Sequence, residues 1–360
     1  MPVAFHQLLS GFADGDAISH CAVTLQEVFR RWGAASEIYV VNGRVAPAMR
    51  HLCRPLSEYR GIPGDVAIHH YSIASPAVET YLQTAARRVM IYHNITPPDY
   101  FAGFDDRVAA QLREALARLP EVVASSHACW ADSAFNALDL TGAGCAQARV
   151  FPLVFSSEPL DVPDDGRVTD KFKVKLTNVL YVGRIAPNKR VENLIETFYW
   201  YHKNLNPFSR LIIIGSDRSC PAYFDMLRML VGDYDLANVC FEGFASPEGL
   251  PSYYRLADVF VSTSDHEGYC LPLLEAMHMG VPVVAHGIGG MPEALGGAGV
   301  QYRGLKPSEL SYLLHRVIHD DAVRAEVLAS QARRMEAVRK RDIEGELREL
   351  LAELPVVVPS

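Results

Sequence analysis

The 360-residue sequence lacks several features that mark whole classes of protein. Basic residues are too few for a nucleic-acid-binding surface, because 34 Lys and Arg against 42 Asp and Glu give a formal net charge of -8. No apolar run approaches the ~20 residues that span a bilayer, and the opening MPVAFHQLLSGF lacks the basic region and apolar core of a signal peptide. The seven cysteines are scattered without a C-x-x-C pair, which argues against a disulfide framework or a zinc site. We therefore expect a cytoplasmic protein with no transmembrane segment and no nucleic-acid partner.

What the sequence does have is a regular alternation of short apolar runs and longer amphipathic segments. The runs are rich in Val, Ile, Phe and Tyr and are bounded by Gly, Pro, Asn or Asp, which is typical of buried parallel strands. The predicted strands are 3–9, 37–41, 65–72, 88–94, 121–126, 148–154, 178–183, 210–215, 238–243, 258–263 and 281–287. Helical stretches such as 18–32 and 191–203 lie between them. The pattern predicts an α/β protein with two Rossmann-like, doubly wound parallel-sheet domains.

A change in composition separates the two series of strands. Residues 156–175 are rich in Pro, Asp and Ser without core periodicity, and no lysine occurs before Lys171. We interpret this segment as a linker and hinge. The predicted domains are 1–165 and 166–338, followed by a C-terminal helical segment, 339–360, packing back on the N-terminal domain.

The stretch HEGYCLPLLEA, residues 266–276, places two acids where a predicted strand hands over to a helix. Gly268 allows close approach of the backbone to a ligand, and Pro272 suits the first turn of a helix. The free N–H groups from Gly268 through Tyr269, Cys270 and Leu271 then form an anion site at the carboxyl end of a strand. Glu267 and Glu275 would accept hydrogen bonds from paired sugar hydroxyls. Taken singly, Glu275 is better explained as an acid that complements the helix dipole, and Glu267 could be an ordinary exposed loop acid.

Two cations follow the first strand of the second half. Arg184 and Lys189, in LYVGRIAPNKR, would neutralise a diphosphate leaving group, although either alone could be a solvated loop charge. The loop has no G-x-G-x-x-G, so a dinucleotide fingerprint is not supported. Phosphate-binding cations beside hydroxyl-binding acids indicate a nucleotide-sugar ligand.

Residues 178–300 resemble the retaining GT-B glycosyltransferases of family 4, and the E-x7-E spacing of Glu267 and Glu275 is specific in this context. The resemblance implies two domains facing a central cleft. It implies that Arg184 and Lys189 bind the donor diphosphate, that Glu267 contacts the donor hexose and that Glu275 contacts the ribose. It also implies a metal-independent, front-face substitution without a covalent nucleophile, in which the leaving phosphate helps to deprotonate the acceptor.

The likeness is weaker in the first half. GFADGDAISH resembles the family's glycine-rich loop facing the donor phosphate, with Gly15 and Asp16 as the best matches, although many relatives have Gly-Gly at this position. His93 matches a histidine beside the transferred sugar, and a satisfied core histidine is the alternative. The remaining candidates, on the acceptor side, are His20, His69, His70 and Asn94.

Three interpretations of the function remain. The chain could be a hexosyltransferase using a GDP-mannose or UDP-glucose type of donor, a nucleotide-sugar epimerase of the same fold, or a non-catalytic nucleotide-sugar sensor. The stretch YHNITPPDYF, 92–101, resembles bacterial transferases that build exopolysaccharide or lipid-linked oligosaccharide. The acceptor would then be a saccharide, a lipid-linked saccharide or a small molecule, with peripheral contact at the inner face of the membrane left open. We expect no cofactor and no metal, and we interpret the D-x-D pair Asp233 and Asp235 as a solvated turn.

Overall fold

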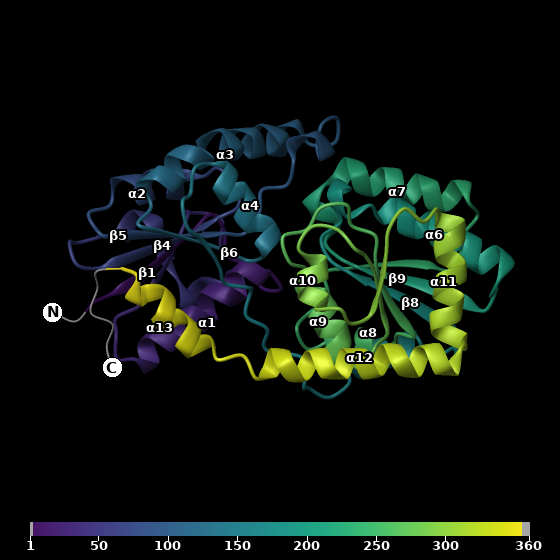
Figure 1. The fold of residues 1–360 in the computed structure, drawn as a ribbon. Coiled ribbons are helices and arrows are strands. Elements are labelled where there is room, and N and C mark those ends of the chain that lie inside the picture. The colour runs from purple at the N-terminus through teal and green to yellow at the C-terminus, as the bar shows by residue number, and fades with distance from the viewer. Residues whose placement is uncertain (1–2, 355–360) are drawn as a thin grey trace. The chain divides into compact units, whose positions relative to one another are not determined.

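The computed structural model describes residues 3–354, and Figure 1 shows how they form two units. Unit 1 comprises residues 3–98, 107–154 and 341–354, and unit 2 comprises residues 99–106 and 155–340. Residues 1–2 and 355–360, which belong to the predicted terminal segments, lie outside the described residues. No helix among residues 3–354 is long and apolar enough to cross a membrane.

Unit 1 is built on a parallel sheet that, within the described residues, has seven strands in the order β3-β2-β1-β4-β5-β6-β7. The strands are β1 (Phe5–Leu9), β2 (Ile38–Val40), β3 (Arg54–Pro55), β4 (Val66–Tyr71), β5 (Arg87–Tyr92), β6 (Ala128–Ala131) and β7 (Ala148–Val150). The helices are α1 (Ala17–Arg31), α2 (Pro76–Gln83), α3 (Asp106–Ser125), α4 (Ala134–Gly142) and α13 (Ile343–Ala352). The strand order reverses between β1 and β4, so the loops that follow these strands meet at the topological switch point.

Unit 2 repeats this design with six strands within the described residues, in the order β10-β9-β8-β11-β12-β13. The strands are β8 (Thr177–Val182), β9 (Ser209–Ile214), β10 (Val239–Gly243), β11 (Val259–Ser262), β12 (Val283–His286) and β13 (Val300–Tyr302). The helices are α5 (Gly166–Lys171), α6 (Val191–Asn204), α7 (Pro221–Asp233), α8 (Leu250–Leu256), α9 (Leu271–His278), α10 (Met291–Leu295), α11 (Pro307–His319) and α12 (Asp321–Arg339). Here the order reverses between β8 and β11. The loops after these two strands carry the cations and acids singled out in the sequence.

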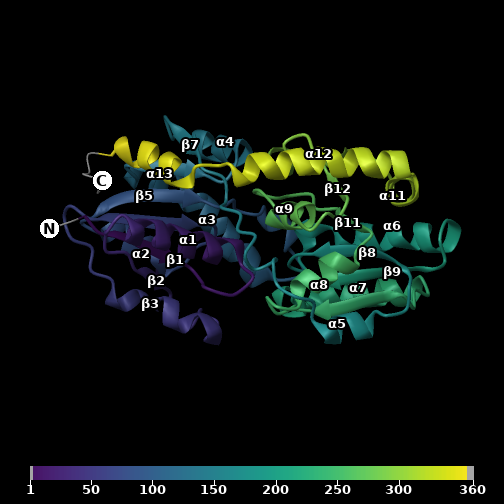
Figure 2. The ribbon, with the colours of Figure 1, turned by 90° about the horizontal axis from the view of Figure 1, so that it is seen from below.

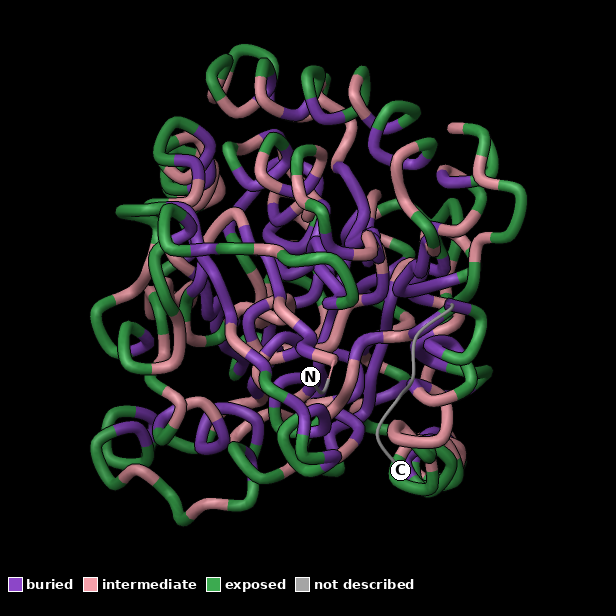
Figure 3. Tube along the Cα trace, turned by 90° about the vertical axis from the view of Figure 1, so that its left-hand side faces the viewer, coloured by how far each residue is buried: buried purple, intermediate pink, exposed green. Residues whose placement is uncertain are grey.

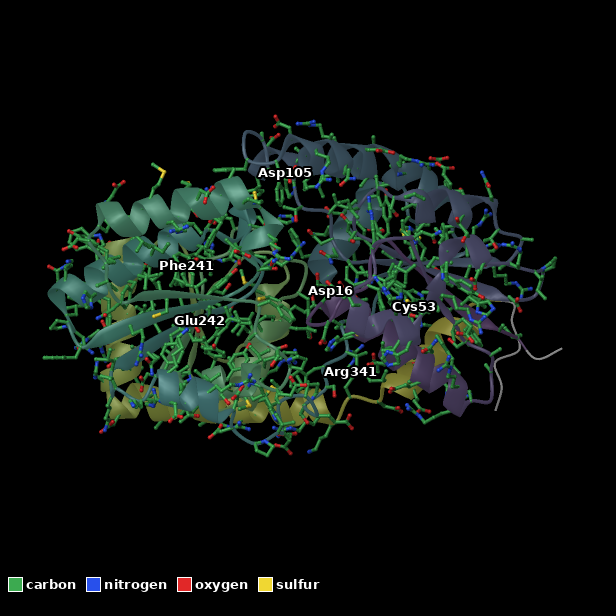
Figure 4. The ribbon with its side chains drawn as sticks, turned by 180° about the vertical axis from the view of Figure 1, so that it is seen from behind. Asp16, Cys53, Asp105, Phe241, Glu242 and Arg341 are labelled. Carbon is green, nitrogen blue, oxygen red and sulfur yellow. The ribbon has the colours of Figure 1, made fainter. Side chains whose placement is uncertain are left out.

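The core of each unit follows from strands that are apolar on both faces. The strand residues Val66, Ile68, Leu211 and Val259 are fully buried, and Figure 3 shows buried stretches inside the molecule with exposed loops around them. The edge strand β10 differs, because Phe241 and Glu242 project to opposite faces of the sheet (Figure 4). Figure 2 shows α12 lying along α9, which it contacts. The predicted fold, two α/β units with parallel sheets, is confirmed.

Several predicted elements differ from the structure. Residues 121–126 were predicted as a strand but form the end of α3, where Val122 and Val123 continue the buried face of the helix in spite of Pro120. The short strands β3, β6 and β13 were missed, because each has at most four residues.

The C-terminal and linker segments also differ in detail. Within the described residues, the predicted terminal segment contains one helix, α13, which begins at Ile343 and not at 339, because α12 ends at Arg339 and Asp342 caps α13 by accepting a hydrogen bond from the Gly345 N–H. Residues 156–175 are not a free linker, since they contain α5 and lie within unit 2. Leu160 and Phe172 are buried there. These scattered apolar residues have no periodicity, which is why the composition alone suggested a linker.

Candidate functional site

The loop after β8 presents Lys189. It contains a short 3-10 turn, Pro187–Lys189, and ends at Arg190, which has a left-handed backbone (φ 50°) immediately before α6. The Lys189 side chain is 13% exposed and its Nζ lies 2.5 Å from Glu267 Oε1. Arg184 precedes it and is exposed, while the buried Tyr181 hydroxyl donates to the Arg184 carbonyl at 3.1 Å. Both predicted cations therefore lie at the carboxyl end of β8.

The loop after β11 holds Glu267 in a fixed position. Besides Lys189, the Ser264 hydroxyl donates to Glu267 Oε1 at 2.9 Å. The backbone of Glu267 is also held, because its carbonyl accepts from the Gly290 N–H at 2.9 Å. Gly289, at φ +62°, packs so closely that a Cβ there would lie 2.5 Å from this carbonyl oxygen. Only glycine fits, and the Glu267 peptide is thereby positioned by the loop after β12.

Further hydrogen bonds tie the two loops to each other. The Asn188 side-chain amide donates to the His266 carbonyl at 3.0 Å, and the Asp265 N–H donates to the Asn188 carbonyl at 2.9 Å. Arg190 Nε donates to Asp265 Oδ2 at 2.5 Å, and the guanidinium lies 5.6 Å from the ring centroid of Tyr100. The loops after β8 and β11 thus form one connected structure around the Lys189–Glu267 pair. Sequence reasoning missed Asn188 and Arg190, because a polar residue in a loop does not indicate which partner the fold brings to it.

The N-terminus of α9 completes this arrangement. Cys270 precedes the helix with a left-handed backbone (φ 74°), and Pro272 occupies its first turn. Burial raises the pKa of the Cys270 thiol well above its usual value, with Glu267 adding to the effect, so the thiol stays neutral. The four residues from Gly268 to Leu271 lead directly into the helix, whose N-terminus favours an anion. The loop that carries Glu267 therefore runs directly into the N-terminus of α9.

Glu275 lies one turn into α9 and is held by a tyrosine that the sequence analysis did not identify. The hydroxyl of Tyr254, a fully buried residue of α8, donates to Glu275 Oε2 at 2.6 Å. Burial raises the pKa of Tyr254 well above its usual range, and the neighbouring Glu275 carboxylate raises it further. The Tyr254 hydroxyl therefore stays protonated, and its hydrogen bond holds the Glu275 side chain in one orientation.

This contact predicts a measurable effect for Tyr254→Phe. The variant leaves Glu275 in place but removes the bond that orients it, so we expect affinity for a nucleoside diphosphate to fall by about 0.5–1.5 kcal/mol, the net value of one hydrogen bond. Calorimetric titration with UDP and GDP measures this change. Tyr253→Phe is the matched control, since the Tyr253 hydroxyl donates to Glu242 instead. Equal losses in both variants would contradict a specific role for Tyr254.

In unit 1, the glycine-rich loop connects β1 to α1. Gly15 is left-handed (φ 70°), and Asp16 is the N-cap of α1, its carboxylate accepting from the Ser19 N–H at 3.0 Å and the Ser19 hydroxyl at 2.7 Å. Figure 4 labels Asp16 at the start of this helix. The side chain that replaces the second glycine of the family pattern thus serves as a helix cap. His20, one turn further, lies 3.6 Å from Asp14 and is partly exposed.

The histidines at the ends of β4 and β5 are buried. His70 Nδ1 lies 2.7 Å from His93 Nε2, and His93 Nδ1 lies 2.9 Å from Asp132 Oδ2. His69 faces the other side of the sheet, where its Nδ1 lies 3.0 Å from the Leu8 carbonyl and burial lowers its pKa to about 4. Asn94 has a left-handed backbone (φ 70°), and its amide donates to Asn136 Oδ1 at 2.8 Å. The structure therefore brings His70 and His93 together and separates His69 from both.

The D-x-D pair lies at the end of α7. Asp233 is the last residue of this helix and Asp235 follows with φ 49° in the connection to β10. Across residues 3–354, no group of three or more His, Cys, Asp or Glu side chains is arranged to hold a metal ion.

Comparisons with known proteins agree with this geometry. Residues 167–335 match the family model described as "Glycosyl transferases group 1". The serotype-specific mannosyltransferase WbdA of Escherichia coli is 26% identical over 170 residues, which cover 46% of this chain and 21% of that protein. A D-inositol 3-phosphate glycosyltransferase of Acidothermus cellulolyticus is 29% identical over 200 residues, which cover 53% of this chain and 44% of that protein. The matches thus span less than half the length of these relatives.

Solved structures resemble the chain over almost its full length. Sucrose-phosphate synthase from Thermosynechococcus elongatus has a TM-score of 0.72 at 18% identity, covering 98% of this chain and 99% of that chain. Anabaena Alr3699/HepE in complex with UDP-glucose has a TM-score of 0.73 at 17% identity, covering 97% of this chain and 100% of that chain. The chain therefore has the GT-B fold, and its residues 167–335 match the glycosyl transferases group 1 family.

Proposed function

We propose that the protein is a retaining glycosyltransferase that moves a hexosyl unit from a nucleoside-diphosphate sugar to an acceptor hydroxyl. The observation that carries this proposal is the Lys189–Glu267 pair at the switch point of unit 2, beside the N-terminus of α9. A cation suited to a phosphate, a carboxylate suited to sugar hydroxyls and a helix N-terminus lie together there. The group 1 match covers the same residues.

The chemistry follows from the exchange of partners in this pair. When a donor binds, its diphosphate offers Lys189 a new anion, and the Glu267 carboxylate is released to accept hydrogen bonds from sugar hydroxyls. Arg184 is exposed at the same strand end and adds a second cation. As the glycosidic bond breaks, these charges and the N–H groups before α9 stabilise the leaving diphosphate. A leaving-phosphate oxygen then takes the proton of the acceptor hydroxyl as the acceptor bonds to the same face of the sugar, and no covalent nucleophile is required.

The donor that we propose is of the GDP-mannose or UDP-glucose type. Several of the curated relatives are named as mannosyltransferases, and one solved structure of the same fold is a complex with UDP-glucose. We place the reaction in the synthesis of an exopolysaccharide or a lipid-linked oligosaccharide, with a cytoplasmic enzyme meeting the acceptor. Support for this setting comes from relatives that are named for O-antigen chains and for phosphatidylinositol monomannoside.

One screen tests the function. The protein is titrated calorimetrically with UDP-glucose, GDP-mannose and ADP-glucose, and release of the nucleoside diphosphate is then followed with and without saccharide acceptors. Transfer with an α-linked product from an α-linked donor supports the proposal. Conversion of the donor sugar without acceptor would instead indicate an epimerase, and tight binding without any turnover would indicate a sensor.

The proposed charge neutralisation by Lys189 and Arg184 predicts that activity survives EDTA. The two side chains supply the positive charge that a divalent metal supplies in other transferases, and Asp233 and Asp235 lie outside the strand ends that form the site. Turnover should therefore change less than about twofold in excess chelator. Loss of a catalytic metal would lower turnover far more, because such a metal stabilises the transition state by several kcal/mol. Complete loss of turnover, restored by Mn²⁺ or Mg²⁺, would contradict the mechanism.

A further inference from the structure

Unit 1 contains a buried chain of polar side chains that crosses four neighbouring strands or their ends. It runs from Gln7 of β1 through His70 of β4 and His93 after β5 to Asp132 after β6, and we call it the Gln7–Asp132 chain. The gaps are 2.8 Å from Gln7 Oε1 to His70 Nε2, 2.7 Å from His70 Nδ1 to His93 Nε2, and 2.9 Å from His93 Nδ1 to Asp132 Oδ2. All four residues are at most 8% exposed. Water therefore does not compete for these contacts.

The orientation of Gln7 fixes the direction of the chain. Its amide nitrogen donates to the Ala22 carbonyl of α1 at 2.7 Å. A carbonyl only accepts hydrogen bonds, so the amide cannot be flipped. The Gln7 oxygen must then face His70, and it can only accept a hydrogen bond from the His70 Nε2–H.

Counting protons along the chain gives a definite result. Each of the three gaps is a hydrogen bond that needs one proton, because two lone pairs would otherwise face each other at less than 3 Å. A carboxylate and two neutral imidazoles together carry only two protons. The Gln7–Asp132 chain therefore holds one further proton, and its net charge is zero. An ordinary pair of neutral histidine and ionised aspartate, with net charge −1, does not satisfy all three bonds.

The extra proton belongs at the Asp132 end. His70 is buried beside the His93 ring, and this burial lowers its pKa well below the usual value, with His93 and His69 adding to the effect. Asp132 is buried too, which raises its pKa, and His93 opposes that effect. The remaining ionisable groups near the chain are His69 on β4, Cys21 on α1 and Arg341 before α13. The extra proton therefore lies in the hydrogen bond between His93 Nδ1 and Asp132 Oδ2, where its positive charge is next to the carboxylate.

We propose that Asp132 and His93 share one buried proton, and that Gln7 and His70 are positioning residues that retain it. The proposal deepens the proposed function, on which its catalytic meaning rests. Both ring nitrogens of His93 are hydrogen-bonded within the chain and its side chain is only 1% exposed. His93 therefore does not accept the proton of the acceptor hydroxyl. The chain instead holds the His93–Asn94 turn, at the carboxyl end of β5, in one neutral arrangement.

The full-length protein without any ligand provides the first test. In ¹⁵N-histidine NMR, long-range proton–nitrogen spectra distinguish nitrogens that carry a proton from those that do not. We expect protonated Nε2 on both His70 and His93, with no titration of either ring between about pH 6 and about pH 8, the range in which an ordinary histidine loses its charge. A His93 ring with an unprotonated Nε2, or titration of that ring within this range, would overturn the proposal.

The variant Gln7→Met tests the role of Gln7. Without the amide oxygen, His70 is free to adopt the Nδ1–H tautomer and to donate to His93 Nε2, so two protons satisfy the two remaining bonds. The extra proton is then no longer required, and we expect the His93 Nε2 proton to be lost as the pH rises. Gln26→Met is the control, because Gln26 of α1 is also a buried amide whose nitrogen donates to a backbone carbonyl, that of Ser36. Identical histidine spectra of Gln7→Met and wild type would contradict the assignment.

The two proposals fail in different ways. If Gln7→Met does not fold, the titration of the wild-type rings still decides the proton count. If no sugar nucleotide is turned over, the proposed function fails but the spectra remain interpretable. With an active donor, Gln7→Met should lower kcat more above neutral pH than below it, whereas Gln26→Met should leave the pH profile unchanged. An unchanged profile in Gln7→Met would show that the shared proton has no part in catalysis.

Discussion

Replacing Lys189 by Met is expected to lower kcat/KM for the sugar nucleotide by about 10²–10³-fold, the usual effect of removing one group that stabilises a leaving anion. Lys189 is the partly buried cation at the switch point of unit 2, and its methylene stem is preserved in Met. The variant also leaves the Glu267 carboxylate, which is 9% exposed, without its counter-charge. We therefore expect a loss of folding stability as well, which has to be separated from the loss of catalysis.

A double variant makes this separation. Lys189→Met combined with Glu267→Gln removes both charges, so thermal stability should recover while activity does not. Lys203→Met is the control for a lysine of the same unit, since Lys203 lies on α6 and is 38% exposed, 3.9 Å from the exposed Asp235. Steady-state kinetics and thermal unfolding of the four proteins provide the comparison. Near-normal kcat/KM in Lys189→Met would remove Lys189 from the leaving-group site.

The sequence predicted the site of unit 2 more completely than that of unit 1. In unit 2 each candidate follows a strong apolar strand, and carboxyl ends of parallel strands meet at one edge of a sheet. The proximity of Lys189 and Glu267 could therefore be inferred from order alone. Their supports could not, because Ser264 and Tyr254 are ordinary polar residues in their own segments. Only the packing of α8 against the sheet brings Tyr254 to Glu275.

In unit 1 the same reasoning identified residues but not their arrangement. His69 and His70 are adjacent in sequence, and period-two alternation places them on opposite faces of β4. Which of the two meets His93 depends on the register of β4 with β5, in which His70 pairs with Ile91. Asp132 and Gln7 gave no signal at all, since one follows a four-residue strand and the other is a single amide within an apolar run. Long-range register, absent from a single sequence, decides the chain of contacts.

The acid at the second position of the E-x7-E pattern allows a sharper test of ligand orientation. If Glu275 contacts the ribose, as we propose, its loss weakens every ligand that contains the nucleoside, whether or not a sugar is attached. If Glu267 contacts the hexose, Glu267→Gln weakens the sugar nucleotide but spares the bare nucleoside diphosphate. Comparing UDP with UDP-glucose, or GDP with GDP-mannose, in both variants therefore distinguishes the two ends of the site.

Glu275→Ala is expected to weaken binding of both the sugar nucleotide and the bare diphosphate by about 1.5–3 kcal/mol, or about 10- to 150-fold in Kd, because a hydrogen bond to a charged group is lost. The truncation also leaves the buried Tyr254 hydroxyl without its acceptor, so part of the effect could arise from local rearrangement. Combining Glu275→Ala with Tyr254→Phe removes that orphaned hydroxyl, and the affinity should stay as low as in the single variant. Glu336→Ala is the control, since Glu336 pairs with Lys340 on the surface of α12. Unchanged diphosphate affinity in a folded Glu275→Ala protein would place Glu275 outside the nucleotide site, and the acid would then be a helix-terminal charge held by Tyr254.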